Sequence, residues 1–182
     1  MIKTIIAKEI EVPEGVDVNI DKYDVMMKGA KGEVNKKLAS KKVTITFQDK
    51  KIKVESKTTS KNEKKIVHTF AAHIKNMIKG CTEGYIYKLK VCSGHFPMNV
   101  SVSGDTFSVK NLFGEKIARV LKVKQGATVK VEGDMINVES VNKEIAGQVA
   151  ADIEQLTKRT GFDKRIFQDG IYIINKAGKE IK

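Results

Sequence analysis

The residues best suited to chemistry are basic and aromatic side chains gathered in "KRTGFDKRIFQDGIYI", residues 158–173. The four basic side chains of this stretch are Lys158, Arg159, Lys164 and Arg165. Arginine can bind a phosphate through two parallel hydrogen bonds, and aromatic rings can stack on unpaired bases. The alternative is that Phe162, Phe167 and Tyr172 only cover the second domain's core. We expect both roles, with the rings holding this tail in place and the basic groups facing outward.

A second segment, "GEKIAR" at residues 114–119, also combines glycine with lysine and arginine. Glycine allows a backbone to approach a phosphate closely, and the two basic side chains can neutralise its charge. A third basic segment lies between residues 31 and 65, where there are twelve lysines and four acidic residues. Lysines without aromatic neighbours often form only a solvated surface, so both interpretations stay open for that segment.

No comparable set of residues points to catalysis or to metal binding. His68 and His73 are five positions apart in a predicted helix, so they point in different directions. The two cysteines, Cys81 and Cys92, do not form the C-x-x-C pair that is common in zinc sites. The glycine motifs of phosphate loops and dinucleotide sites are also missing. We therefore expect no enzyme activity, no metal and no cofactor.

The charge of the chain narrows the class of partner. Among 182 residues, 34 are lysine or arginine and 22 are acidic, which gives a net charge of +12. Such an excess favours a polyanion, either nucleic acid or an anionic membrane surface. No apolar run approaches the roughly 20 residues of a membrane span, and the predicted helices carry acids among their lysines. We therefore expect no membrane partner, and the two cysteines suit a reducing, cytoplasmic compartment.

An internal repeat indicates how the chain is organised. The matched segments are 18–34 with 100–116, 44–56 with 128–140, and 66–74 with 145–153, at spacings of 82, 84 and 79 residues. Three matches in the same order at nearly constant spacing indicate a duplicated domain. We expect a first domain at residues 1–82 and a second domain, with the basic tail, at residues 83–182.

Each copy has the same predicted elements. The first two segments alternate apolar and polar residues, which is typical of half-buried strands, and the third has helical spacing. Ser60 and Glu63 fit a capping box at the start of the first helix. The predicted fold is therefore α+β, with two duplicated small domains, each an antiparallel sheet with one covering helix.

Four segments of the chain are distinctive: "NMIKGCTEGYIYKL", "HFPMNVSV", "NLFGEKIAR" and "AGQVAADIEQLTKRTGFDKRIFQDGIYI". Together they resemble the universal large-subunit ribosomal protein six family, in its archaeal and eukaryotic cytosolic form. The resemblance covers nearly the whole chain and includes its duplicated layout. It implies a structural protein of the large ribosomal subunit that binds large-subunit rRNA.

The resemblance also implies where RNA is bound. In that family the second domain and tail hold rRNA close to the sarcin–ricin loop, beside the translation-factor site, and the first domain is peripheral. The implied rRNA contacts are Lys116, Arg119, Lys158, Arg159, Lys164 and Arg165. Neighbouring large-subunit proteins are further implied partners. The competing function is a free RNA-binding or regulatory module of the same two-domain shape.

Overall fold

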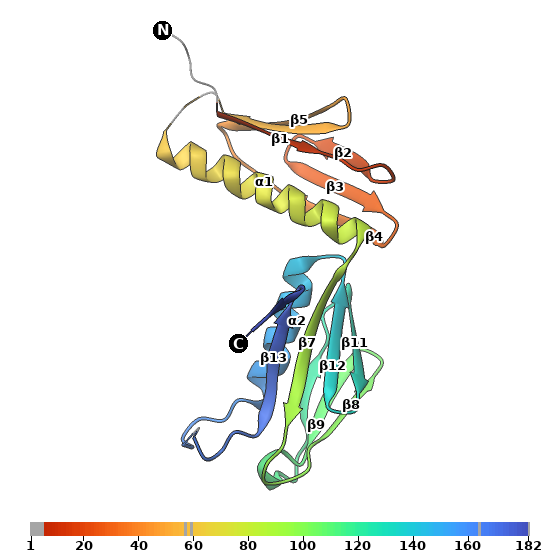
Figure 1. Ribbon diagram of the computed structural model, residues 1–182, viewed down its shortest axis with the longest axis vertical. Coiled ribbons are helices and arrows are strands. Elements are labelled where there is room, and N and C mark those ends of the chain that lie inside the picture. Colours follow the sequence, from red (N-terminus) through yellow and green to blue (C-terminus); the bar gives the residue numbers. More distant parts are fainter. Residues whose placement is uncertain (1–5, 57, 59, 164, 182) are drawn as a thin grey trace. The chain divides into compact units, whose positions relative to one another are not determined.

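A computed structural model describes residues 6–56, 58, 60–163 and 165–181. Lys164, one of the expected RNA contacts, lies outside the described residues. The chain divides into two units, Met1–Gly84 and Tyr85–Lys182, just after the predicted boundary at residue 82. Each unit combines strands with a helix (Figure 1).

In the first unit, helix α1 packs on two antiparallel sheets with strand orders β1-β6-β5 and β2-β3-β4. The elements are β1 (Ile6–Glu11), β2 (Asp17–Asp21), β3 (Asp24–Gly29), β4 (Gly32–Lys37), β5 (Val43–Gln48), β6 (Lys51–Ser56) and α1 (Lys61–Thr82). The buried face of α1 carries Val67, Phe70, Ile74 and Met77. These residues recur every three or four positions, so they form the apolar stripe that covers the sheets.

Helix α1 begins at the predicted capping residue, although the cap acts through side chains. Ser60 is the N-cap, and its hydroxyl donates a hydrogen bond to the carboxylate of Glu63 instead of accepting one from the backbone. The buried Glu63 also accepts a 2.8 Å hydrogen bond from Nζ of Lys42. This pair ties the connection before β5 to the first turn of α1.

The second unit contains a five-stranded sheet, β11-β12-β7-β13-β14, and a three-stranded sheet, β10-β9-β8. Its elements are β7 (Tyr85–Cys92), β8 (Asn99–Ser103), β9 (Thr106–Lys110), a 3-10 turn (Leu112–Gly114), β10 (Arg119–Lys122), β11 (Ala127–Glu132), β12 (Met135–Ser140), α2 (Lys143–Thr157), β13 (Gly170–Lys176) and β14 (Lys179–Glu180). Val149 and Ile153 of α2 share one buried core with Leu89 of β7, Phe107 of β9 and Ile171 of β13. The segment after α2 thus returns to the sheet and contributes to the core.

The two units repeat one topology, which confirms the predicted α+β fold of two duplicated domains. Strands β1, β6 and β5 correspond to β7, β12 and β11, and β2-β3-β4 corresponds to β8-β9-β10. The register repeats as well, because Phe47 faces Ile52 as Val131 faces Ile136. In each unit the repeated strands divide between two sheets, a detail that the sequence did not predict. Alternation shows which face of a strand is buried, whereas turns and distant strands decide its hydrogen-bond partners.

Candidate nucleic-acid interface

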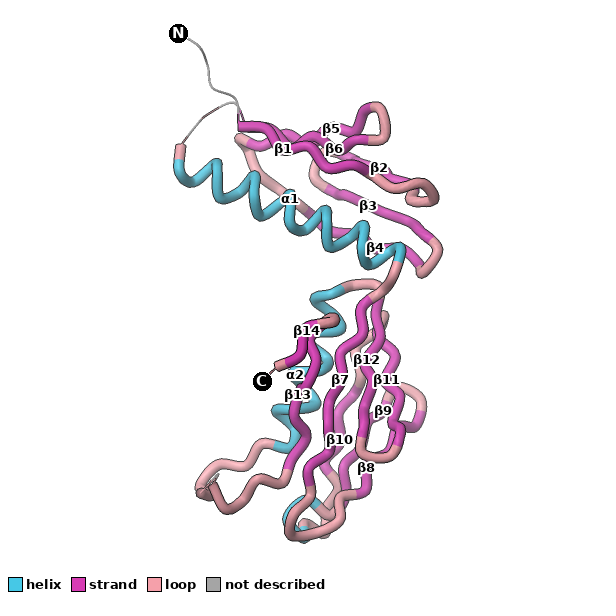
Figure 2. The backbone as a smooth tube through the Cα atoms, in the orientation of Figure 1, coloured by secondary structure: helices cyan, strands magenta, loops and turns pink. Residues whose placement is uncertain are grey.

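Three loops of the second unit lie toward the same end of its strands (Figure 2), and we call them the loop end. They are residues 93–98 between β7 and β8, residues 111–118 between β9 and β10, and residues 158–169 between α2 and β13. Phe162 stacks on Phe113 with ring centroids 5.9 Å apart and meets the edge of Phe167 at 4.9 Å. Phe167 stacks in turn on His95 at 5.1 Å. The rings therefore hold the tail against the other two loops.

The buried Asp169 joins the tail to the loop after β7. Its Oδ1 accepts hydrogen bonds from the backbone N–H of Gly94 at 2.8 Å and from Nδ1 of His95 at 3.1 Å, and its Oδ2 accepts one from the N–H of His95 at 3.1 Å. Burial raises the pKa of this carboxyl, but the hydrogen bonds from Gly94 and His95 outweigh it, and the net pKa is lowered. Asp169 is therefore held as a carboxylate, and its negative charge is bound by Gly94 and His95 of the same unit.

Arg119 joins the loop after β9 to the end of α2. Its Nη2 and Nε donate to the two carboxylate oxygens of Glu115, at 2.6 and 2.8 Å. Its Nη1 donates to the carbonyl oxygens of Leu156, at 2.7 Å, and Lys158, at 3.3 Å. The hydrogen bond from Arg119 is the main cause of the lowered pKa of Glu115. A positive charge at a helix C-terminus also stabilises the unpaired carbonyls there.

Arg159 lies over the aromatic cluster. Its guanidinium carbon is 4.2 Å from the ring centroid of Phe162 and 5.5 Å from that of Phe113. Its Nη1 is also 3.8 Å from Oε1 of Glu115. This side chain is 35% exposed, so it can contribute to the cluster and still present part of its charge to a ligand.

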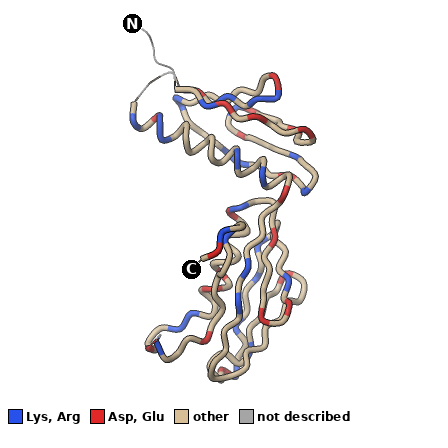
Figure 3. Tube along the Cα trace, viewed as in Figure 1, with Lys and Arg blue, Asp and Glu red and all other residues tan. Residues whose placement is uncertain are grey.

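Three further basic residues of the loop end, Lys116, Lys158 and Arg165, face outward. Lys116 and Lys158 are exposed, and neither forms an ion pair with any residue that the structure describes. The side chain of Arg165 is 90% exposed and lies 2.9 Å from a carboxylate oxygen of Asp163. Figure 3 shows basic positions, in blue, along the segment between α2 and β13. An exposed ion pair of this kind contributes little to stability, so phosphate could replace Asp163 as the partner of Arg165.

Exposed apolar residues accompany this charge. The large apolar side chains that remain exposed here are Phe96, Ile117, Phe162 and Ile166, and Ile117 is the most open at 84%. A small cavity of about 180 Å³ lies beside them, with Phe113, Arg159 and Tyr172 in its lining. Tyr172 does not cover the core, since it is exposed and its hydroxyl donates to the carbonyl of Gln168. Rings and apolar groups beside lysines suit contacts with unpaired bases and with sugars.

The structure therefore groups most of the expected site residues and separates their roles. Arg119 and Arg159 share Glu115, whereas Lys116, Lys158 and Arg165 present charge to solvent. The sequence did not indicate that Asp169 and His95 would organise the site. These residues are 74 positions apart, and no local pattern links them. For Glu115 the sequence did contain a signal, because the pair Gly–Glu occurs at matched positions of the two copies, 32–33 and 114–115. This repeat marks Glu115 but does not reveal which residues it contacts.

Histidines and acids elsewhere do not assemble into a metal site within the described ranges. No group of three or more His, Cys, Asp and Glu side chains there could hold a metal ion. His68 and His73 instead lie beside lysines, with Nδ1 atoms 3.2 Å from Nζ of Lys8 and 3.1 Å from Nζ of Lys36. Among the described residues, no helix is long and apolar enough to cross a membrane.

A duplicated α+β chain with a net charge of +12 and exposed basic residues on its loop end has the features of a protein that attracts polyanions. Comparison with known proteins identifies the family. The family described as Ribosomal protein L6 matches residues 12–84 and 96–170, one segment in each unit. The chain is also 45% identical, over 98% of its own length and 98% of the relative's, to "Large ribosomal subunit protein uL6" of Methanococcus vannielii. The chain belongs to the ribosomal protein L6 family, as the resemblance predicted, and is a structural ribosomal protein and not an enzyme.

Proposed function

We propose that this chain is a structural constituent of the large ribosomal subunit and binds large-subunit rRNA through the loop end of its second unit. Membership of the L6 family and the 45% identity to a large-subunit protein support the first part. The second part rests on the basic residues of the loop end. The proposed rRNA contacts are Lys116, Lys158, Arg159, Lys164 and Arg165.

One observation carries the proposal. Two carboxylates of the loop end are bound by other groups of the protein, whereas the ammonium groups of two lysines are exposed to solvent. Glu115 is occupied by Arg119 and Asp169 by His95 and Gly94. Lys116 and Lys158 lie exposed beside these anchored carboxylates. A phosphate backbone would therefore meet positive charge on loops that are already held in place. Preorganised donors lose less conformational freedom on binding than mobile ones do.

In this proposal Arg119 supports the loop end, although the family resemblance had suggested an rRNA contact. Its side chain is 24% exposed, and each nitrogen of its guanidinium donates to Glu115 or to a carbonyl oxygen. A phosphate would have to compete with the bidentate Glu115 pair. We therefore assign Arg119 the role of positioning Lys116 and the end of α2.

The family resemblance extends the proposal to a location. The bound rRNA would lie close to the sarcin–ricin loop, beside the translation-factor site, and the first unit would lie toward the periphery. Neighbouring large-subunit proteins would be further partners, and the assembled particle would work in the cytoplasm.

The experiment that tests RNA binding is a salt titration with an rRNA fragment that contains the sarcin–ricin loop. The test variant carries Lys116→Ala, Lys158→Ala and Arg165→Ala. The matched control carries Lys31→Ala, Lys41→Ala and Lys61→Ala, three exposed lysines of the first unit. Each lost phosphate contact should reduce the log–log salt slope by about 0.7–0.9, so the test variant should lose roughly 2–3 units. Equal losses in both variants would place the RNA contact elsewhere.

Sedimentation separates this function from that of a free RNA-binding module. The tagged chain should travel with large subunits in a sucrose gradient and stay with them at moderate salt. A chain that remains at the top of the gradient would favour the free module, even if the loop end binds RNA.

A further inference from the structure

The second unit holds a strand at a place that the first unit leaves open. Strand β7 pairs with β12 on one side and with β13 on the other. Strand β1 pairs with β6 on one side, and no strand among the described residues pairs with its other edge. An open edge presents unpaired backbone donors and acceptors that another strand could use.

The hydrogen bonds show that this open edge is the equivalent of the β13 site. The backbone N–H of Val12 donates to the carbonyl oxygen of Lys50 at 2.9 Å, and that of Val91 donates to Asp134 at 2.8 Å. Lys50 and Asp134 are matched positions of the internal repeat. Val12 and Val91 therefore occupy the same place in the two sheets, and both point toward the inner neighbour, β6 or β12.

The direction of the free groups on β1 follows from the same bond. In an antiparallel ladder, successive residues point their N–H and C=O groups alternately to the two sides. Because Val12 points toward β6, Glu11 and Glu9 point toward the open edge. The residue equivalent to Glu11 is Lys90, which faces Tyr172 of β13. Glu9 and Glu11 therefore offer the backbone groups to which an added strand would bind.

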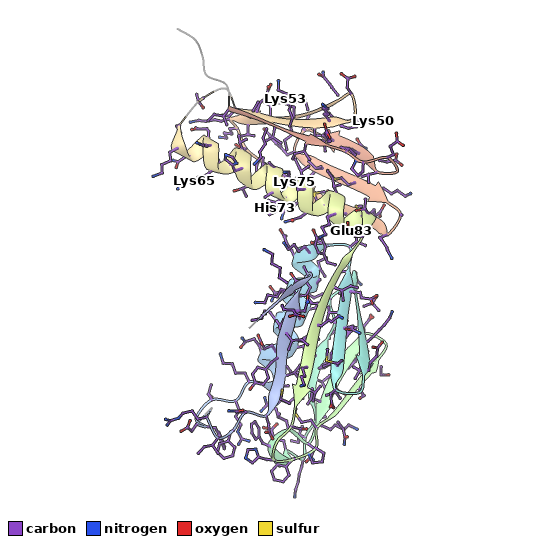
Figure 4. The ribbon with its side chains drawn as sticks, viewed as in Figure 1. Lys50, Lys53, Lys65, His73, Lys75 and Glu83 are labelled. Carbon is purple, nitrogen blue, oxygen red and sulfur yellow. The ribbon has the colours of Figure 1, made fainter. Side chains whose placement is uncertain are left out.

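An open groove of about 570 Å³ lies between this edge and α1. Glu9, Ile10 and Glu11 of β1 form one wall, and Lys75 and Ile78 of α1, with Glu83 just after the helix, form the other. Figure 4 labels Lys75 on the second half of α1 and Glu83 just after the end of the helix. In the second unit the corresponding space contains β13, which packs against both β7 and α2.

The helix wall differs between the two units, which indicates a different occupant. In the second unit, Thr157 and Glu154 of α2 accept hydrogen bonds from the N–H groups of Ile171 and Ile173, at 2.9 and 3.2 Å. The repeat places Ile78 and Lys75 at these positions of α1. Ile78 offers an apolar contact and Lys75 a donor, so the occupant should present an apolar side chain and a carbonyl there.

The charge of the groove favours a polypeptide over RNA. Its lining contains three carboxylates, on Glu9, Glu11 and Glu83, and three ammonium groups, on Lys51, Lys75 and Lys79. Lys51 lies 3.4 Å from Glu11, and Lys79 lies 3.5 Å from Glu83. A balanced lining on a chain with a net charge of +12 gives a phosphate backbone no particular attraction.

We propose that the open edge of β1 binds an extended segment of a neighbouring protein as an added antiparallel strand. The segment would alternate apolar residues, which pack on Ile10 and Ile78, with basic residues, which face Glu9 and Glu11. Backbone hydrogen bonds would supply affinity and the alternating side chains specificity, as in other cases of strand addition. The proposal involves no RNA, so it can succeed or fail independently of the function proposed for the second unit.

The test is a nuclear magnetic resonance titration of the ¹⁵N-labelled full chain with a capped synthetic peptide that alternates lysine and valine. Saturable shifts are expected for the amides of β1 and for the end of α1. In the bound strand the lysine amides would face β1. The control peptide therefore carries N-methylated lysines, which keep the side chains and remove those donors. Loss of two backbone hydrogen bonds should weaken binding by roughly tenfold.

A protein variant gives the reciprocal test. Glu9→Pro removes a donor on the open edge, a position where proline is tolerated, and should also weaken binding about tenfold. Glu9→Gln retains the donor and should bind more tightly than Glu9→Pro. Circular dichroism checks folding. If Glu9→Pro does not fold, the comparison of the two peptides still tests whether a strand is added to β1.

Equal binding of the two peptides, or shifts confined to other regions, would overturn the proposal. Shifts at β1 caused by an rRNA fragment and not by the peptide would identify an RNA surface instead.

Discussion

The two units close the C-terminal end of their helix in different ways. In the first unit, the backbone N–H of Lys31 donates to the carbonyl oxygen of Cys81 at 3.0 Å. Gly29 lies so close that a Cβ there would be 2.7 Å from the same oxygen. In the second unit, the guanidinium of Arg119 binds the carbonyl oxygen of Leu156 at 2.7 Å. One helix end is closed by a hairpin backbone and the other by a side chain.

This difference in how the helix end is closed goes with a difference between the equivalent hairpins β3–β4 and β9–β10. Only the hairpin of the second unit contributes to the loop end. Strands β3 and β4 are joined by residues 30–31, whereas β9 and β10 are joined by residues 111–118. The longer connection carries Lys116 and places Phe113 against the tail rings. The same strands and helix thus support a short turn in one copy and the proposed rRNA interface in the other. In this proposal the function belongs to loops that a common scaffold positions.

The largest expected effect comes from breaking the anchor of the loop end. Asp169→Ala leaves the N–H groups of Gly94 and His95 without their acceptor, and should lower the free energy of unfolding by about 2–3 kcal/mol. Urea denaturation at neutral pH measures this change. The control is Asp163→Ala, which removes an exposed ion pair with Arg165 and should lower stability much less. Similar losses in both variants would show that Asp169 is not the anchor.

The next effect tests the hairpin closure of the first unit. Gly29→Ala forces a Cβ against the backbone of Cys81 and should cost about 1–3 kcal/mol, because the helix end or the hairpin must move. The matched position in the second unit is Asn111, where the longer loop has a backbone φ of 61°. Asn111→Gly suits that conformation and should change stability by less than about 1 kcal/mol. Denaturation curves in which the two variants lose equal stability would contradict the contrast between the hairpins.

A smaller effect separates positioning from direct contact. Arg119→Lys keeps the charge and loses the bidentate bond to Glu115, so unfolding should become easier by about 1–2 kcal/mol. RNA affinity should fall because the loop end is less well held, while the salt slope should stay unchanged. Lys116→Ala should instead reduce the slope by about 0.7–0.9. If Arg119→Lys loses slope like Lys116→Ala, then Arg119 contacts a phosphate directly.

The smallest effect is a pH dependence. The folded pKa of Asp169 is lowered because hydrogen bonds from Gly94 and His95 outweigh burial. Its contribution to stability is therefore present above the unfolded pKa of about 3.9 and is lost as the pH falls through the folded pKa. Asp169→Asn should show a shallower loss of stability below about pH 4 than the unchanged chain. Parallel curves for the two proteins would exclude Asp169 as a source of acid sensitivity.

The sequence predicted the duplicated fold because strand alternation and helical spacing recur in both copies and do not depend on distant contacts. It also identified the tail, since basic and aromatic residues are adjacent there. It did not predict that β13 would pair with β7, or that His95 would bind Asp169, because these contacts join segments that are far apart in the chain. The hydrogen bonds of Arg119 to Glu115 and Leu156 were equally hidden, since composition does not show which groups a guanidinium contacts.

Ultraviolet crosslinking in intact large subunits tests whether the loop end of the second unit is the main rRNA contact, as we propose. Crosslinked peptides would be identified by mass spectrometry. Peptides from residues 111–118 and 158–169 should carry the most rRNA nucleotides, and these nucleotides should come from the region of the sarcin–ricin loop. Crosslinks concentrated in the lysine-rich residues 31–65, with none in the loop end, would contradict the proposal.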